Sequence, residues 1–149
     1  MKKVRQIRLI EVKSEVGAGT RGASLGVDAV KIAALDFRSS FFKEHRSMNI
    51  PDDNVALHGL VENRYAKRIR SVLKMYERTG AALKDALRDG KFPIVISGDH
   101  STAGGTIAGI KMAYPESRLG VIWIDAHADL HSPFTSPSGN MHGMPLATA

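Results

Sequence analysis

The sequence contains no cysteine, which excludes disulfides and thiolate metal sites and fits a reducing, cytoplasmic location. It also lacks any apolar run of about 18 residues, the length that a transmembrane helix needs. The N-terminal M-K-K-V-R-Q-I-R carries charges where a signal peptide requires an unbroken apolar stretch. We therefore expect a cytoplasmic protein with no membrane partner.

Aromatic residues make up only 6% of the 149 residues, yet the composition is neither low-complexity nor disordered. This length suits one domain with a real core, residues 1–149. The formal net charge of +6 raises the question of a nucleic-acid partner. The densest basic stretch, from Arg64 to Arg78, interleaves its charges with apolar residues at helical spacing, which is typical of a solvated helix face. We expect no nucleic-acid partner, and a basic nucleic-acid-binding domain remains a distant alternative.

Strand and helix patterns alternate along the chain. Three apolar or β-branched runs predict strands: Val4–Val12, Phe92–Ile96 and Leu119–Ile124. The last two are wholly apolar, as in strands covered on both faces. Helices are expected over Val27–Phe37, from about Asn63 to Gly90, and over Ser101–Tyr114, whereas residues 38–59 look irregular. This order predicts an α/β fold, a doubly wound, mostly parallel sheet with helices on both faces.

Apolar spacing also predicts which helix residues are buried. In the first helix the stripe is Val27, Val30, Ala34 and Phe37. In the long second helix it is Tyr65, Ile69, Val72, Tyr76, Leu83 and Leu87, with Gly90 as the C-terminal cap. In the third helix, Gly104 and Gly105 favour close packing.

Two predicted strands end in polar clusters, S-G-D-H-S after Ile96 and D-A-H-A-D after Ile124. Ligands of parallel sheets bind beyond the carboxyl ends of the strands. If the second cluster stays extended, Asp125, His127 and Asp129 point the same way, and His100 reaches them from the neighbouring strand. Gathering carboxylates is costly unless a cation neutralises them. Imidazole and carboxylate ligands without thiolate suit Mn, Fe or Zn, and a carboxylate-rich set favours Mn.

A second motif, Gly17-Ala18-Gly19-Thr20-Arg21-Gly22, satisfies the G-x-G-x-x-G pattern of dinucleotide-binding sites. That fingerprint requires its first glycine directly after a buried strand. Here K-S-E-V intervenes and the preceding run is half charged. We therefore do not favour a dinucleotide site.

Three motifs together, S-G-D-H-S, I-D-A-H-A-D and S-G-N-M-H-G-M-P-L, resemble successive motifs of the arginase branch of the ureohydrolase family. They occur in the family's order from about Ala82 onward. The resemblance implies an arginase-like fold and a site for two manganese ions. It also implies hydrolysis of a guanidinium group, arginine giving ornithine and urea, and a homo-oligomer, a trimer or hexamer. Agmatinase-type and formimidoylglutamase-type relatives are the alternatives within the family.

The resemblance assigns a role to each matching residue. His100, Asp125, His127 and Asp129 would bind manganese, with Asp125 bridging both ions. Asp129 would also contact the bridging hydroxide and pass a proton toward the leaving amine. His142 would shuttle protons near the substrate. The substrate-binding positions are Ser138, Asn140 and His131.

Two features depart from the family pattern. His131 stands where arginases commonly carry an asparagine that helps to hold the substrate carboxylate, so this position bears on the identity of the substrate. The family's later S-x-D-x-D-x-x-D motif, which supplies further metal ligands, is not found in these residues. We therefore expect the chain to represent the N-terminal half of the family domain, with incomplete metal binding and little turnover by itself. A non-catalytic metal-binding or interaction remnant is the rival hypothesis.

Overall fold

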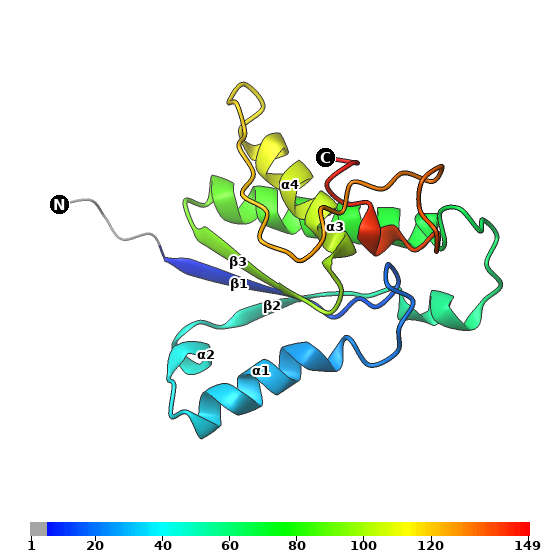
Figure 1. Cartoon of the computed structure of the whole chain (residues 1–149). Helices are drawn as coiled ribbons and strands as arrows, with labels where there is room; N and C mark the ends of the chain where they lie inside the picture. Colours follow the sequence, from blue (N-terminus) through cyan, green and yellow to red (C-terminus); the bar gives the residue numbers. More distant parts are fainter. Residues whose placement is uncertain (1–5) are drawn as a thin grey trace.

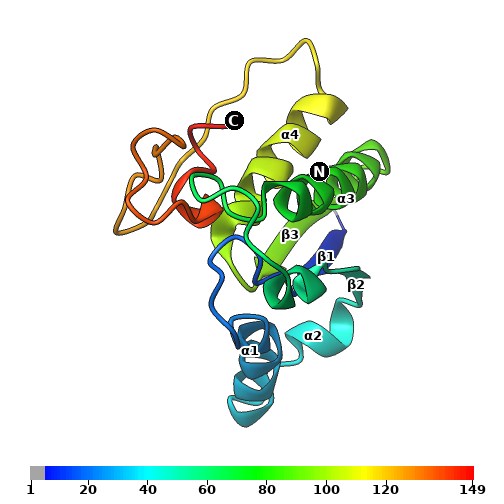
Figure 2. The same ribbon diagram turned by 90° about the vertical axis from the view of Figure 1, so that its right-hand side faces the viewer.

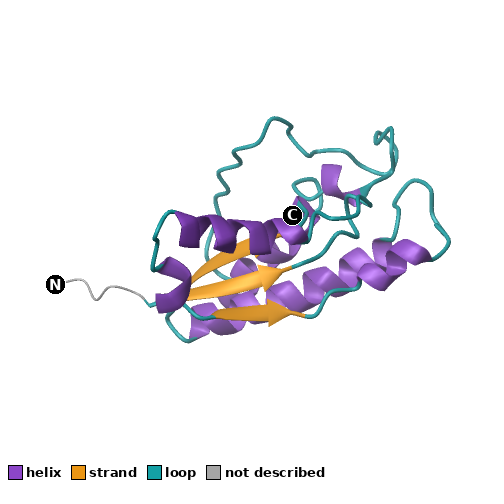
Figure 3. Cartoon of the chain, turned by 90° about the horizontal axis from the view of Figure 1, so that it is seen from below, coloured by secondary structure: helices purple, strands orange, loops and turns teal. Residues whose placement is uncertain are grey.

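A computed structural model describes residues 6–149 and contains a parallel three-stranded sheet with helices on both faces (Figure 1). The strands are β1 (Ile7–Val12), β2 (Ser47–Ile50) and β3 (Phe92–Ser97), in the order β2-β1-β3. All three run in the same direction (Figure 3), so their carboxyl ends share one edge. The predicted α/β class is confirmed. Val4 and Arg5, part of the first predicted strand, lie outside the described residues.

Helices cover the two faces of the sheet unequally. On one side lie α1 (Leu25–Asp36) and the single-turn α2 (Phe41–Glu44). On the other side lie α3 (Ile69–Arg88) and α4 (Ala103–Ala113), which pack against each other (Figure 2). Short 3-10 turns stand at Asn54–His58, His100–Thr102 and Met141–Gly143. The second and third of these turns lie at the carboxyl edge of the sheet.

The main core lies between the sheet and α3. Because strand side chains alternate, Ile10 and Val12 point to this side. They pack with Val72, Met75 and Leu83 of α3, and with Met141 and Met144 from the C-terminal segment. On the opposite face of β1, buried Glu11 forms an ion pair with Lys31 of α1 at 2.5 Å.

Helix α3 follows its predicted pattern in its middle and at its C-terminal end. Gly90 has a φ of +70°, and the N–H groups of Gly90 and Lys91 donate to the carbonyls of Leu87 and Ala86. This is a Schellman cap, as the sequence predicted. The predicted start of the helix at about Asn63 was wrong. The side-chain oxygen of Asn63 accepts hydrogen bonds from the N–H groups of Tyr65 and Ala66, which form a turn. The helix therefore begins only at Ile69. Tyr65 and Ile69 consequently lie half exposed, outside the core.

Glycines bring α3 and α4 into close contact, as predicted. A Cβ on Gly105 would lie 2.7 Å from the Cα of Tyr76, and one on Gly104 would lie 2.5 Å from the Tyr76 ring. Gly109 meets Gly80 in the same way. The buried face of α4 is therefore its glycine face, and Met112 is 45% exposed.

The burial expected for α1 was partly wrong. Val27 is buried, but Val30 and Phe37 are 49% and 85% exposed. The helix contacts the sheet instead through Val27 and Lys31, whose ammonium reaches Glu11. Residues 38–59, which the sequence pattern predicted to be irregular, contain α2 and the strand β2.

The predicted strand Leu119–Ile124 is the largest correction. These residues form no strand, and Ile122 and Ile124 are 89% and 93% exposed. A cavity of about 410 Å³ is lined by residues 119–123 on one side and by Val95 of β3 and Ile107 of α4 on the other. With this neighbour missing, β3 is an edge strand in the described part of the chain, and none of its residues is fully buried. Across residues 6–149, no helix combines the length and apolarity that crossing a membrane requires.

Candidate metal centre

The site begins where β3 ends. Asp99 extends the strand, and His100 opens the turn that leads into α4. The Asp99 carboxylate caps this turn by accepting the N–H of Ser101 at 2.9 Å. The His100 ring is thereby placed at the carboxyl edge of the sheet, where the parallel topology predicted it.

Three predicted metal ligands meet at this edge. One side-chain donor atom from each of His100, Asp125 and Asp129 lies within 4.8 Å of the other two. Nε2 of His100 is 3.4 Å from Oδ2 of Asp129. This buried nitrogen has no hydrogen-bond partner among residues 6–149. A buried nitrogen and two carboxylates without a partner cation form a suitable donor set for a divalent metal.

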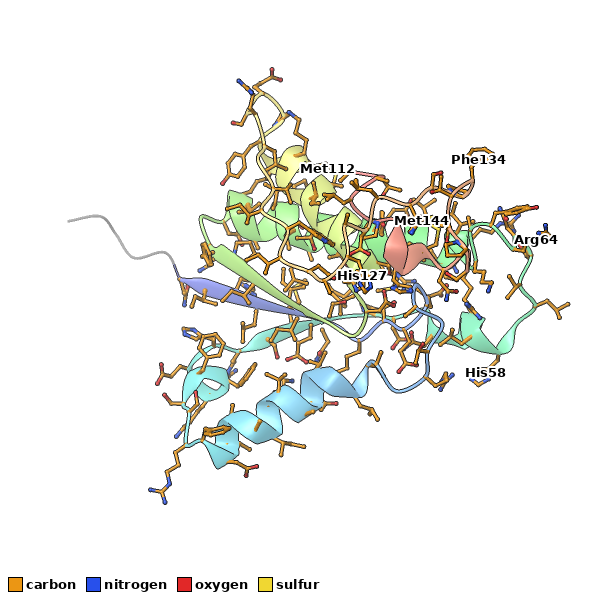
Figure 4. The ribbon with its side chains drawn as sticks, viewed as in Figure 1. His58, Arg64, Met112, His127, Phe134 and Met144 are labelled. Carbon is orange, nitrogen blue, oxygen red and sulfur yellow. The ribbon has the colours of Figure 1, made fainter. Side chains whose placement is uncertain are left out.

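His127 does not join this group. The chain bends after Asp125, whose Oδ1 accepts the backbone N–H of His127 at 2.9 Å. That hydrogen bond is the main reason why the pKa of Asp125 lies below its usual range. The bend leaves the His127 side chain 82% exposed beside the carboxyl end of the sheet (Figure 4). The extended alternation expected for D-A-H-A-D is therefore absent, and the ligand role of His127 stays a prediction.

Asp129 is held in an unusual backbone conformation. Its φ is +49°, in the left-handed region that residues other than glycine rarely adopt. Its carbonyl accepts the N–H of Leu146, and its Oδ2 accepts the indole N–H of Trp123 at 3.2 Å. Trp123 thereby belongs to the surroundings of the candidate ligands. No local sequence pattern predicts this contact.

A cavity of about 570 Å³ opens beside the grouped ligands. Its lining includes all four predicted substrate and proton-transfer residues, His131, Ser138, Asn140 and His142, together with His100 and Asp129. The His142 ring lies 5.2 Å from the His100 ring, edge to face. The volume falls within the range of small-molecule sites.

The loop that carries Ser138 and Asn140 is fixed from below by the segment before α3. The N–H of Lys67 donates to the carbonyl of Gly139 at 2.8 Å. Gly139 has a φ of +70°, and a Cβ there would meet the Arg64 carbonyl at 2.0 Å. Only glycine fits this contact, so the glycine of the S-G-N motif places the loop.

Comparison with known proteins identifies the family of this chain. The family model described as "Arginase family" matches residues 5–149. The chain belongs to the arginase family. Among curated proteins, the arginase of Brevibacillus brevis is 38% identical over 149 residues, covering 97% of this chain and 48% of the relative. The arginase of Bacillus caldovelox is 37% identical and is covered to 49%.

Solved arginase structures share the fold. The native Bacillus caldovelox arginase superimposes with a TM-score of 0.78 at 36% identity, over 96% of this chain and 48% of that one. The Entamoeba histolytica arginase, solved in complex with L-ornithine, gives 0.73 at 30% identity, over 96% of this chain and 49% of that one. The chain thus spans about half the length of the arginases that it matches.

Proposed function

We propose that this chain carries part of the active site of a manganese-dependent, arginase-like hydrolase that converts arginine to ornithine and urea. The observation that supports the proposal is the convergence of His100, Asp125 and Asp129 beside the 570 Å³ cavity. We further propose, on family resemblance alone, a cytoplasmic homo-oligomer for the whole enzyme.

The donor set fits manganese. Nε2 of His100 would ligate through its lone pair, and the Asp125 and Asp129 carboxylates would supply hard oxygen ligands. His127, one bend away, would join them by rotating its exposed side chain. When bound, the metal would act as a Lewis acid and would lower the pKa of a water molecule bound to it toward neutrality.

The protein's own groups would orient the substrate and move protons. Asp129 Oδ2 is buried and adjoins the ligand His100, so it is placed to hold a proton and pass it to the departing amine. The His142 ring, 5.2 Å from that of His100, would exchange this proton with solvent. Ser138 and Asn140, on the rim of the cavity, would bind the amino-acid end of arginine.

His131 would contact the same end of the substrate. The backbone N–H of His131 donates to the Gly143 carbonyl at 3.0 Å, which fixes the backbone at this residue. The imidazole ring lies beside the Thr135 hydroxyl. An imidazole N–H can donate to a carboxylate as an asparagine amide does. We therefore propose arginine as the substrate, with agmatine, which lacks the carboxylate, as the alternative to be tested.

Manganese binding is the first experiment. Electron paramagnetic resonance of free Mn²⁺ during titration measures affinity and stoichiometry for the wild type, for Asp125→Asn/Asp129→Asn, and for His58→Asn, an exposed histidine outside the cavity. We expect the double variant to bind at least about tenfold more weakly, because two of the grouped carboxylates are neutralised. Equal binding by all three proteins would contradict the metal centre.

The second experiment compares substrates. Urea release from arginine and from agmatine is measured for the protein with Mn²⁺, alone and together with the C-terminal half of the Bacillus caldovelox arginase. We expect little turnover by the chain alone and a preference for arginine when the site is completed. A preference for agmatine would overturn the substrate assignment, and manganese binding without turnover in either state would favour the non-catalytic rival.

A further inference from the structure

The buried Asp99 carboxylate accepts hydrogen bonds from two segments of the chain, the loop that contains Gly17 and the turn that contains Ser101. Only 5% of the residue is exposed. Its backbone N–H donates to the Ser14 carbonyl at 3.0 Å. Its Oδ2 accepts the N–H of Gly17 at 3.1 Å, and its Oδ1 accepts the N–H of Ser101 at 2.9 Å. One side chain therefore joins the glycine-rich loop to the turn that carries His100.

The same Gly17 peptide continues the connection to His142. While its N–H binds Asp99, its carbonyl accepts the N–H of His142 at 3.2 Å. A single hydrogen-bonded path thus runs from the residues flanking His100, through Asp99 and Gly17, to the backbone of His142. The two histidine rings at its ends lie 5.2 Å apart.

Close packing at Gly17 leaves this path little freedom. A Cβ on Gly17 would lie 2.2 Å from Oγ of Ser101 and 2.7 Å from Oδ1 of Asp99. No side chain at position 17 would fit, because the Gly17 backbone packs directly against the side chains of Ser101 and Asp99. Asp99 and Gly17 therefore link the backbone segments that carry His100 and His142.

We propose that Asp99 is a positioning residue that fixes His142 relative to His100 through Gly17. The inference deepens the proposed function, on which the roles of the two histidines rest. A carboxylate suits this position because both of its oxygens face N–H donors. An asparagine would present an NH₂ group to one of these donors and lose that hydrogen bond.

Amide hydrogen exchange tests the connection without metal. The variant is Asp99→Asn, and the matched control is Asp89→Asn, the same change at an exposed residue after α3. We expect the Gly17 and His142 amides to exchange about tenfold faster in Asp99→Asn, the effect of losing a hydrogen bond to a charged group. Protection in α3 should stay unchanged in both variants. Unchanged protection of Gly17 and His142 in Asp99→Asn would overturn the proposal.

A second variant covers the case in which Asp99→Asn loses protection everywhere. Gly17→Ala keeps the carboxylate but forces the two loops apart. We expect faster exchange at His142 with normal protection in α3. Normal protection at His142 in Gly17→Ala would then overturn the proposal by itself.

Paramagnetic broadening separates this inference from the proposed function. Bound Mn²⁺ is expected to broaden the ring resonances of both His100 and His142 in the wild type. In Asp99→Asn, the broadening of His142 should fall while that of His100 is kept. If Mn²⁺ broadens neither histidine resonance in the wild type, the result counts against the metal centre. The proposal for Asp99 would then be tested by the amide hydrogen exchange measurements alone. Equal His142 broadening in wild type and variant would count against Asp99 alone.

Discussion

At the scale of single residues, buried carboxylates organise the loops around the site. Glu15 is 2% exposed, and its Oε1 accepts the N–H of Gly22 at 2.7 Å, the N–H of Ser24 at 3.0 Å and the Ser24 hydroxyl at 2.6 Å. The hydroxyl bond is the main cause that holds the pKa of Glu15 below its usual range. Glu15 therefore ties the glycine-rich loop to the beginning of α1.

Replacing Glu15 by Gln should lower the free energy of unfolding at pH 7 by about 1–3 kcal/mol, because hydrogen bonds to a charged acceptor are lost. A carboxyl with a lowered pKa in the folded state stabilises the protein above its unfolded pKa, about 4.3, and this contribution disappears as the pH falls through the folded pKa. Urea unfolding of wild type and variant from pH 7 to pH 3 should therefore show the difference shrinking. Glu77→Gln, an exposed change on α3, is the control; a difference independent of pH would contradict this account.

At the scale of elements, the sequence predicted helix ends that depend on neighbouring residues. It did not predict strands that form only by pairing with a segment distant in the sequence. The end of α3 was predictable because Gly90 closes its own helix. Strand β2 was missed because S-M-N-I has no β-branched run, and it is a strand only through pairing with β1. The apolar run Leu119–Ile124 has the composition of a strand but no pairing partner in the described part of the chain. For the site, the motifs identified the residues, whereas the bend at Asp125 that turns His127 away has no clear signal in D-A-H-A-D.

The contact between α3 and α4 offers a test at this scale. Gly105→Ala should destabilise the protein by about 1–3 kcal/mol, because its methyl group would lie 2.7 Å from the Tyr76 backbone. In α1, Gly26 has open space around it, so Gly26→Ala should be neutral or stabilising by up to about 1 kcal/mol. Thermal or urea unfolding of both variants measures the contrast. Similar effects at the two sites would show that close helix packing is not what Gly105 provides.

At the scale of the whole molecule, the described residues expose apolar side chains next to the open edge of β3. Ile122 and Ile124 are almost fully exposed, while the 410 Å³ cavity beside them is lined by apolar residues of β3 and α4. The chain covers only about half of its relatives. An unpaired sheet edge with exposed isoleucines promotes self-association.

Ile122→Thr/Ile124→Thr should leave the free energy of unfolding of this chain nearly unchanged while reducing its self-association. Leu9→Ala, at a fully buried position in β1, should cost about 2–5 kcal/mol. Urea unfolding and analytical ultracentrifugation distinguish the two effects. A loss of more than about 1 kcal/mol in the double variant would mean that residues 119–124 pack as the buried strand that the sequence predicted.

Trp123 is the one tryptophan of the chain, and its indole N–H donates to the Asp129 oxygen that is also a candidate metal ligand. A carboxylate oxygen has more than one lone pair, so a cation that binds this oxygen would lie directly beside the indole and perturb its hydrogen bond. The intrinsic fluorescence of the protein is then a label-free gauge of cation loading. Manganese, itself a paramagnetic quencher, should dim the emission, and diamagnetic magnesium should mainly shift its wavelength. If neither ion changes the fluorescence, the Trp123 indole does not lie beside a bound cation.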